Sequence, residues 1–302
     1  MIRQNFNADW TVEKGDGNSR MNSFLGNTQT KTVHLPYDAM IHEARTPDTK
    51  NGAQTGFYPG GEYIFQKHFT APQAWQGKPV SLVFEGVYQT ALVYLNGWLL
   101  TRNVNGYAEF TVEAGPYLKY GADNLLKVIA DNSLEPNSRW YTGSGIYRPV
   151  RLLVGNKVYL PQDTVRITTR EADEGFALLD VTAQVQSAST ITERVTLQQT
   201  ICREGTAVLT DRQNLLLQPG ESRTVSFRYC VDSPALWSPE NPNLYTSTMQ
   251  VLEGEEELDR EETGFGIRTL SIDAAHGVRI NGQTVKPVSY THLRAHETSA
   301  HL

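Results

Sequence analysis

The sequence predicts an all-β protein built from two consecutive β-sandwiches, and three observations carry this prediction. Apolar and polar residues alternate with period two along many short stretches, which is typical of half-buried strands. Residues 1–155 contain no stretch with helical periodicity over three turns. The length of 302 residues, with ordinary Gly and Pro content, suits two domains of roughly 100–200 residues each.

The first half shows the alternation at residues 80–84, 91–95 and 126–130, and residues 150–154 are expected to form one more strand. Asn96-Gly97 lies between two apolar runs, which is the strongest short signal for a β-hairpin. We therefore expect residues 1–158 to form one antiparallel sandwich.

The second half continues the alternation at residues 179–185, 195–199, 225–231 and 245–251, with turns at Gln218–Glu221 and Glu253–Glu256. Short strands at this spacing over roughly 100 residues predict a seven-strand immunoglobulin-like sandwich. We assign residues 159–270 to it. The pair of cysteines with a central Trp that marks antibody domains is missing, so the domain is not of the antibody type.

Composition narrows the function classes. The net charge of −6, from 27 basic and 33 acidic side chains, argues against nucleic acid and anionic membranes as partners. There is no run of 18 apolar residues and no long apolar segment after Met1, so we expect a cytoplasmic protein.

Cys202 and Cys230 stand on the opposite parity from their apolar neighbours, which predicts unpaired thiols on polar strand faces. No pair of histidines at metal-ligand spacing comes with a third ligand. His292 and His296 stand four apart, but they lie in a segment that we interpret below as non-native, so we expect no metal site in this chain.

Seven ordered groups of residues resemble glycoside hydrolase family 2, the family of β-galactosidases and β-glucuronidases. The group around Trp140 is the most specific of the seven. Taken together, the residues of these groups most resemble the bacterial β-galactosidase branch. The groups are Leu35–Met40, Gly61–Phe69, Phe84–Val87 with Val93–Gly97, Gly106–Phe110, Pro136–Arg148, Leu236–Tyr245, and Gly264–Arg268 with Ile280–Gly282.

This resemblance implies a jelly-roll sugar-binding domain at residues 1–158 and the start of a TIM barrel at residues 271–286. It also implies a retaining hydrolase of β-galactosides, which uses two barrel glutamates about 5–5.5 Å apart as acid/base and nucleophile. Both glutamates would lie beyond the matching segment, so we nominate no catalytic residue and expect this chain to be inactive. The full-length parent would act on β-galactoside sugars, with metal ions and homo-oligomers allowed by the family.

Residues 287–302 depart from the family pattern, because the expected Leu-Arg-Gly segment and barrel strand do not follow Lys286. The segment resembles translated sequencing adapter, and we interpret it as a non-native tail. A chain that ends at Lys286 should be at least as stable as the 302-residue chain.

The residues that we propose for substrate binding are Asn137, Arg139 and Trp140. A Trp offers an apolar face to the C–H bonds of a sugar ring, and Arg and Asn donate hydrogen bonds to hydroxyls. In the alternative interpretation, Trp140 and Arg148 pack the first sandwich against the barrel without touching sugar. Some relatives carry an acidic ligand just before this Trp, whereas this chain has Asn137, Ser138 and Arg139, so no metal ligand is carried over.

A second function remains open. A double sandwich without a barrel would be a stand-alone carbohydrate-binding protein with no hydrolase activity. Saturable binding of galactosides and a natural stop near Leu302 would favour it.

Overall fold

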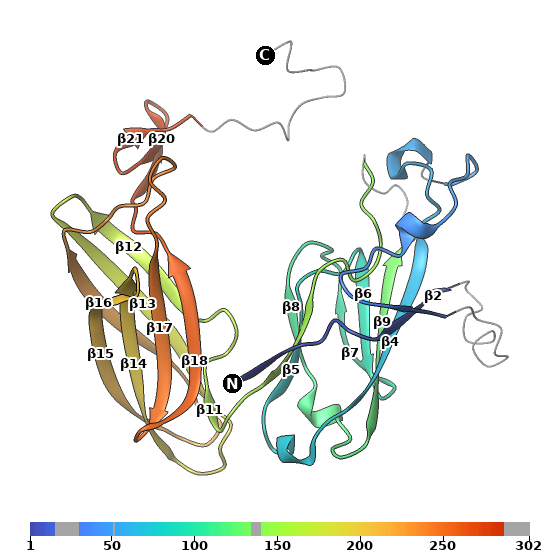
Figure 1. Ribbon diagram of the computed structural model, residues 1–302, viewed down its shortest axis with the longest axis horizontal. Helices are drawn as coiled ribbons and strands as arrows, with labels where there is room; N and C mark the ends of the chain where they lie inside the picture. The colour runs from blue at the N-terminus through green and yellow to red at the C-terminus, as the bar shows by residue number, and fades with distance from the viewer. Residues whose placement is uncertain (16–29, 51, 134–139, 287–302) are drawn as a thin grey trace. The chain divides into compact units, whose positions relative to one another are not determined.

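The computed structural model describes residues 1–15, 30–50, 52–133 and 140–286, and it divides the chain into two compact units, Met1–Lys157 and Val158–Leu302. Each unit is made of antiparallel β-sheets (Figure 1). The described helical segments are single 3-10 turns, η1 (Met40–His42), η2 (Gly52–Thr55), η3 (Gln73–Trp75) and η4 (Gly115–Tyr117). Over the described residues, none of the helical segments has the length and apolar character needed to cross a bilayer. The predicted all-β fold class is thus confirmed.

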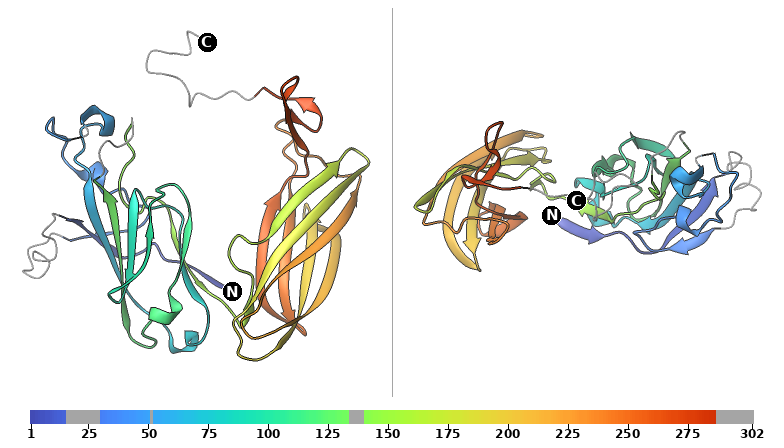
Figure 2. Two further views of the ribbon diagram at one scale, coloured as in Figure 1. Left: turned by 180° about the vertical axis from the view of Figure 1, so that it is seen from behind. Right: turned by 90° about the horizontal axis from the view of Figure 1, so that it is seen from above.

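The first unit is a sandwich of two antiparallel sheets, seen from behind in Figure 2. The four-stranded sheet has the order β1 (Ile2–Asn5), β10 (Val150–Val154), β5 (Val80–Phe84), β8 (Phe110–Glu113). The six-stranded sheet has the order β3 (Lys31–Val33), β2 (Trp10–Gly15), β4 (Gly61–Thr70), β9 (Asp123–Asn132), β6 (Thr90–Leu95), β7 (Trp98–Asn103).

The core of the first unit lies between these two sheets and follows from the alternation in sequence. Val80, Leu82 and Phe84 of β5 are buried, as are the alternate residues Leu126, Val128 and Ala130 of β9. Trp10 of β2 is fully buried, and its indole N–H donates to the Phe6 carbonyl at 2.8 Å. The polar edge of this large ring is therefore satisfied inside the apolar core.

The Asn96-Gly97 turn joins β6 to β7, as predicted from sequence. Both residues have positive φ, 52° and 90°, which is the backbone of a type I′ turn. The Asn96 side chain also donates to the Tyr117 carbonyl at 2.8 Å, and this contact fastens the turn to the segment after β8.

The second unit is also a sandwich. In one sheet, β13 (Phe176–Ser187) pairs on one side with β11 (Val158–Tyr159) and β12 (Arg166–Ala172), and on the other with β16 (Ser222–Asp232). The other sheet has the order β15 (Thr206–Leu217), β14 (Glu193–Arg203), β17 (Tyr245–Glu253), β18 (Glu256–Phe265). A small sheet of β19 (Leu270–Asp273), β20 (Gly277–Ile280) and β21 (Gln283–Thr284) follows.

The inward residues of β13 and β16 form the core of this unit, and they are the alternating apolar residues at 177–185 and 225–231. Cys202 on β14 is half-buried and Cys230 on β16 is exposed, and both thiols are free as predicted. Trp237 is half-buried at a corner, where the Arg268 guanidinium lies 4.3 Å from its ring and its backbone N–H donates to the Ile267 carbonyl.

The division between the units falls just before Val158, because Val158 and Tyr159 pair with Ser187 and Gln186 of the second sandwich. Residues 270–284 pair as a small sheet, and their assignment to the start of a barrel stays a prediction. The tail at residues 287–302 lies outside the described residues.

Candidate functional site

The candidate site lies in the first unit, at the end of the six-stranded sheet where β4 begins and β9 ends. Gly61 of β4 pairs there with Asn132 of β9. The connection from β3 to β4 carries the turns η1 and η2, and Figure 1 shows these turns in blue beyond the sheet end. Residues 140–146, which precede β10, lie against this connection, as the following contacts show.

Asp38 joins the two segments. Its Oδ2 accepts the Tyr141 hydroxyl at 2.6 Å, and its Oδ1 accepts the backbone N–H groups of Ser144 at 2.9 Å and Met40 at 3.1 Å. Tyr141 is 103 residues away from Asp38 in sequence. A carboxylate that accepts three such bonds holds both loops in one arrangement, since charge-assisted hydrogen bonds are the stronger kind.

Gly143 makes this close approach possible. Its φ is +72°, and a Cβ at this position would lie 2.7 Å from Oδ2 of Asp38. The buried Asn132 side chain donates to the Gly143 carbonyl at 3.0 Å, which ties the loop to the end of β9. Any larger residue at position 143 would push the loop away from Asp38.

A hollow with a volume of about 150 Å³ opens beside this junction, lined by Ile41, Arg45, Gly56, Tyr58 and Tyr141. The Tyr58 and Tyr141 rings meet edge to face, with centroids 5.2 Å apart. The Arg45 guanidinium carbon lies 5.1 Å from the Tyr58 ring centroid, which is a cation–π distance. The hollow thus combines aromatic rings with one cationic hydrogen-bond donor.

Apolar side chains stand exposed on the segments that form the hollow. Trp140 is 63% exposed and directly precedes Tyr141, Ile41 is 51% exposed, and Phe57 is 42% exposed and directly precedes Tyr58. Exposed aromatic side chains gathered at one place are typical of a binding surface.

The tyrosines at the junction remain protonated. Burial raises the pKa of Tyr141 well above its usual value, and the hydrogen bond to Asp38 adds to the shift. Burial, with the charges of Glu43 and Asp38, likewise raises the pKa of Tyr63. The Tyr63 hydroxyl is buried and has no hydrogen-bond partner among the described residues. Both phenols are therefore neutral at ordinary pH, and the Tyr141 hydroxyl donates to Asp38.

Of the residues predicted for substrate binding, Trp140 lies at this site. Asn137 and Arg139 lie outside the described residues. Arg148 is exposed and belongs to a different cluster, where its guanidinium lies 5.4 Å from the Tyr147 ring. Arg45 and Tyr58 were not predicted from sequence, because they lie on a loop without periodicity that meets Tyr141 only through the fold.

The described residues contain no group of three His, Cys, Asp or Glu side chains that could hold a metal ion. The expectation that this chain carries no metal or cofactor stays a prediction.

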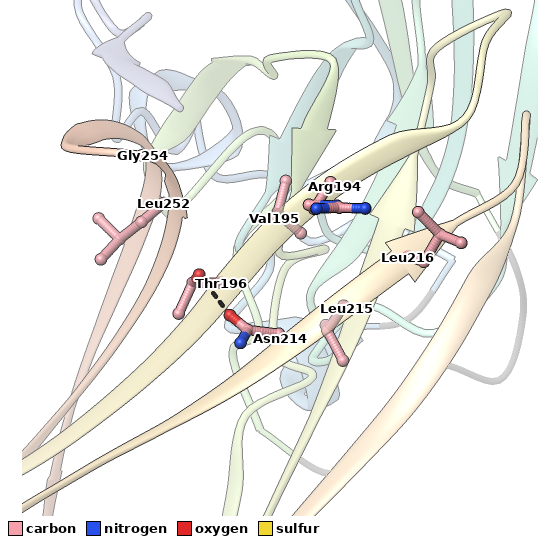
Figure 3. A pocket seen from close by; sticks show the side chains of 8 residues that line it. All are labelled: Arg194, Val195, Thr196, Asn214, Leu215, Leu216, Leu252 and Gly254. Atoms are coloured by element: carbon pink, nitrogen blue, oxygen red, sulfur yellow. Dashed lines mark hydrogen bonds between the residues drawn. The ribbon is translucent and has the colours of Figure 1, made fainter.

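A second hollow, of about 350 Å³, lies on the second unit (Figure 3). It runs across β14, β15 and β17, and the Thr196 hydroxyl donates to the Asn214 side-chain oxygen at 2.9 Å within it. None of its lining residues is aromatic, so it offers no stacking face for a sugar ring. Its lining residues are Arg194, Val195, Thr196, Asn214, Leu215, Leu216, Leu252 and Gly254.

Two family models match the chain. The glycosyl hydrolase 2 galactose-binding domain-like model matches residues 10–176, and the glycosyl hydrolases family 2 model matches residues 158–268. The galactose-binding domain-like match covers most of the unit that carries the site and runs on to residue 176, and the other match lies within the second unit.

Curated relatives match nearly the whole chain. This chain is 34% identical to a β-galactosidase of Bacteroides ovatus, and the match covers 94% of this chain and 34% of that protein. It is 26% identical to a β-glucuronidase of Formosa agariphila, over 93% of this chain and 31% of that protein. The chain therefore spans about a third of the length of these relatives.

Among solved structures, a glycosyl hydrolase family 2 member from Bacteroides cellulosilyticus superimposes with a TM-score of 0.86 at 29% identity, covering 95% of this chain and 38% of that one. These matches cover both sandwiches and agree with the ordered motifs of the sequence. The chain belongs to glycosyl hydrolase family 2.

Proposed function

We propose that this chain is the N-terminal part of a retaining glycoside hydrolase that acts on β-galactosides, and that its first sandwich contributes sugar contacts to the parent enzyme. The observation that carries the proposal is the match to the Bacteroides ovatus β-galactosidase over 94% of this chain. Because this match occupies 34% of that relative, the remaining two thirds would supply the catalytic glutamates.

The hollow beside Trp140 supports the part of the proposal that concerns sugar binding. A pyranose has C–H bonds on its faces and hydroxyls on its rim, and the hollow offers the Tyr58 and Tyr141 rings together with the Arg45 donors. Binding pockets for small ligands combine apolar walls with a few fixed polar groups in this way. The bond from Tyr141 to Asp38 keeps one wall fixed before any ligand arrives.

The sugar contact is tested by titrating the 302-residue chain with methyl β-D-galactopyranoside and following backbone amide shifts by NMR. We expect saturable shifts near Tyr58 and Tyr141 at millimolar concentration, and a several-fold loss of affinity in Trp140→Ala. Trp98→Ala is the matched control, because Trp98 is 66% exposed but lies at the other end of the six-stranded sheet, where β9 begins. Unchanged binding in Trp140→Ala, or no binding by the unsubstituted 302-residue chain, would contradict the proposal.

The absence of catalysis is tested separately with a nitrophenyl β-galactoside. We expect no turnover by the 302-residue chain, since the two carboxyl groups of a retaining glycosidase must flank the scissile bond. Measurable turnover that survives repurification would place a catalytic pair inside this chain and overturn the proposal.

The proposal also includes a cytoplasmic location, with neither nucleic acid nor membrane as partner and no resident cofactor in this chain. The free thiols Cys202 and Cys230 are compatible with a reducing compartment. The excess of acidic over basic side chains supports the exclusion of nucleic acid.

A further inference from the structure

Arg45 gives the hollow beside Trp140 a chemistry that a neutral sugar does not need. Its guanidinium lies over the Tyr58 ring at 5.1 Å, and Tyr58 is held in turn against Tyr141. A guanidinium that stacks on a ring keeps its N–H donors in one plane, where they are available at the edge for a ligand.

Two acidic side chains close to Arg45 in sequence, Glu43 and Asp38, already have other partners, and Asp48 forms no ion pair with Arg45. Glu43 pairs with Lys14 at 2.8 Å, and Asp38 accepts the Tyr141 hydroxyl and two backbone N–H groups. Across the described part of the chain, Arg45 forms no ion pair. The hollow therefore contains a cation whose charge no described side chain neutralises.

The size and walls of the hollow limit what the cation can bind. The hollow is small, about 150 Å³, which suits one sugar unit better than a longer chain. The aromatic walls suit the face of a pyranose, and the planar donors of Arg45 match the two oxygens of a carboxylate or sulfate.

We propose that the hollow lined by Arg45, Tyr58 and Tyr141 binds an anionic sugar unit, with the acidic group on Arg45 and the ring against the aromatic walls. This inference rests on the proposed sugar binding at the same hollow and adds the charge of the ligand. The parent enzyme would then accept saccharides that carry an acidic unit beside the unit it cleaves.

The test compares three ligands by NMR titration of the 302-residue chain: methyl β-D-galactopyranoside, methyl β-D-galactopyranosiduronate and methyl β-D-galactopyranoside 6-sulfate. We expect at least one of the two anionic sugars to bind about fivefold tighter than the neutral one, the scale of a solvent-exposed ion pair with good geometry. Added salt should reduce this preference. A preference for the uronate alone would identify a carboxylate ligand, and a preference for the sulfate alone a sulfate ligand.

Arg45→Gln should remove the preference for the anionic sugars. The preference is the ratio of two affinities, so a loss of hydrogen bonds to hydroxyls, which weakens all three ligands, does not affect it. Arg45→Lys should keep part of it, since the charge is retained without the planar donors. Arg148→Gln is the matched control, because Arg148 is also exposed and also stacks on a tyrosine. It should leave the preference intact.

The outcomes separate this inference from the proposed function. Equal binding of all three sugars, or a preference that survives Arg45→Gln, overturns the anionic ligand and leaves sugar binding in place. Binding of an anionic sugar without any binding of the neutral one supports the inference and overturns the galactoside contact. No binding of any of the three overturns both.

Discussion

Asp38 shows how one side chain fixes a site made from distant parts of the sequence. It lies two residues before Met40, whose N–H it accepts, but its other partners are Tyr141 and Ser144. Hydrogen bonds to a charged acceptor are worth about 1.5–3 kcal/mol, more than most neutral ones. The rigidity of the hollow therefore depends on a residue that does not line it.

Replacing Asp38 by Ala should destabilise the first unit by about 2–3 kcal/mol, because the Tyr141 hydroxyl and two backbone N–H groups lose their acceptor. Urea unfolding followed by amide signals of the first unit measures this loss. Asp48→Ala is the control, because Asp48 is exposed and its carboxylate makes no hydrogen bond or ion pair within the described part of the chain. Equal effects of the two substitutions would show that the Asp38 contacts do not stabilise the loops.

At the scale of elements, a carboxylate on β13 connects three strands. Asp180 accepts Arg228 of β16 at 2.8 Å and Arg170 of β12 at 3.1 Å, both through the guanidinium Nε. The hydrogen bond from Arg228 lowers the pKa of Asp180, and the positive charges of the two arginines add to the shift. The central strand of the sheet is thereby linked to both of its neighbours on the outer face.

A lowered carboxyl pKa sets the sign of the pH dependence. The stabilising effect of Asp180 is present above the ordinary Asp pKa of about 3.9 and is lost as the pH falls through its lower folded value. A carboxyl ¹³C titration should therefore place the Asp180 midpoint below that of an ordinary Asp. In Asp180→Asn, the free energy of unfolding of the second unit should depend less steeply on pH below the ordinary Asp pKa of about 3.9.

Asp232→Asn serves as the control for this titration. Asp232 is exposed on β16, and its carboxylate makes no hydrogen bond or ion pair among the described residues. Its replacement should leave the acid transition unchanged. An Asp180 midpoint at or above the ordinary value would contradict the prediction.

The elements also show what the sequence could and could not predict. β9, β13 and β16 were predicted because buried residues alternate along them with half-buried or exposed ones. β5 was predicted because Val80, Leu82 and Phe84 are apolar at every second position, although Val83 is buried as well. β15 was not predicted, because it lies at the sheet edge, where only Leu215 and Leu217 are buried and no alternation marks the first nine residues. An edge strand needs no continuous apolar face, so period two is weak there.

The candidate site was predictable in part for a related reason. Trp140 lies within a family motif, whereas Arg45 and Tyr58 lie on the loop that carries η1 and η2. Loop residues follow neither a period of two nor a helical period. Their meeting with Tyr141 depends on the pairing of Gly61 with Asn132, which brings the two loops to one end of the sheet.

At the scale of the whole molecule, each unit has its own apolar core. Leu82 is fully buried in the core of the first unit, and Leu197 is fully buried in the core of the second. The core residues fall on either side of the division between Lys157 and Val158. A domain with its own core can in principle fold alone.

Leu82→Ala should therefore destabilise the first unit by about 2–5 kcal/mol, the usual cost of a cavity in a packed core, and Leu197→Ala should do the same to the second. Hydrogen exchange followed residue by residue measures both units in one sample. In Leu82→Ala, protection should fall across β5 and β9 and stay unchanged in β13 and β14. The double variant should show the sum of the two single effects, because sites without shared partners are additive. Loss of protection in β13 on changing Leu82 would mean that the second sandwich depends on the first for its stability, and the sugar-binding unit could then not be studied in isolation.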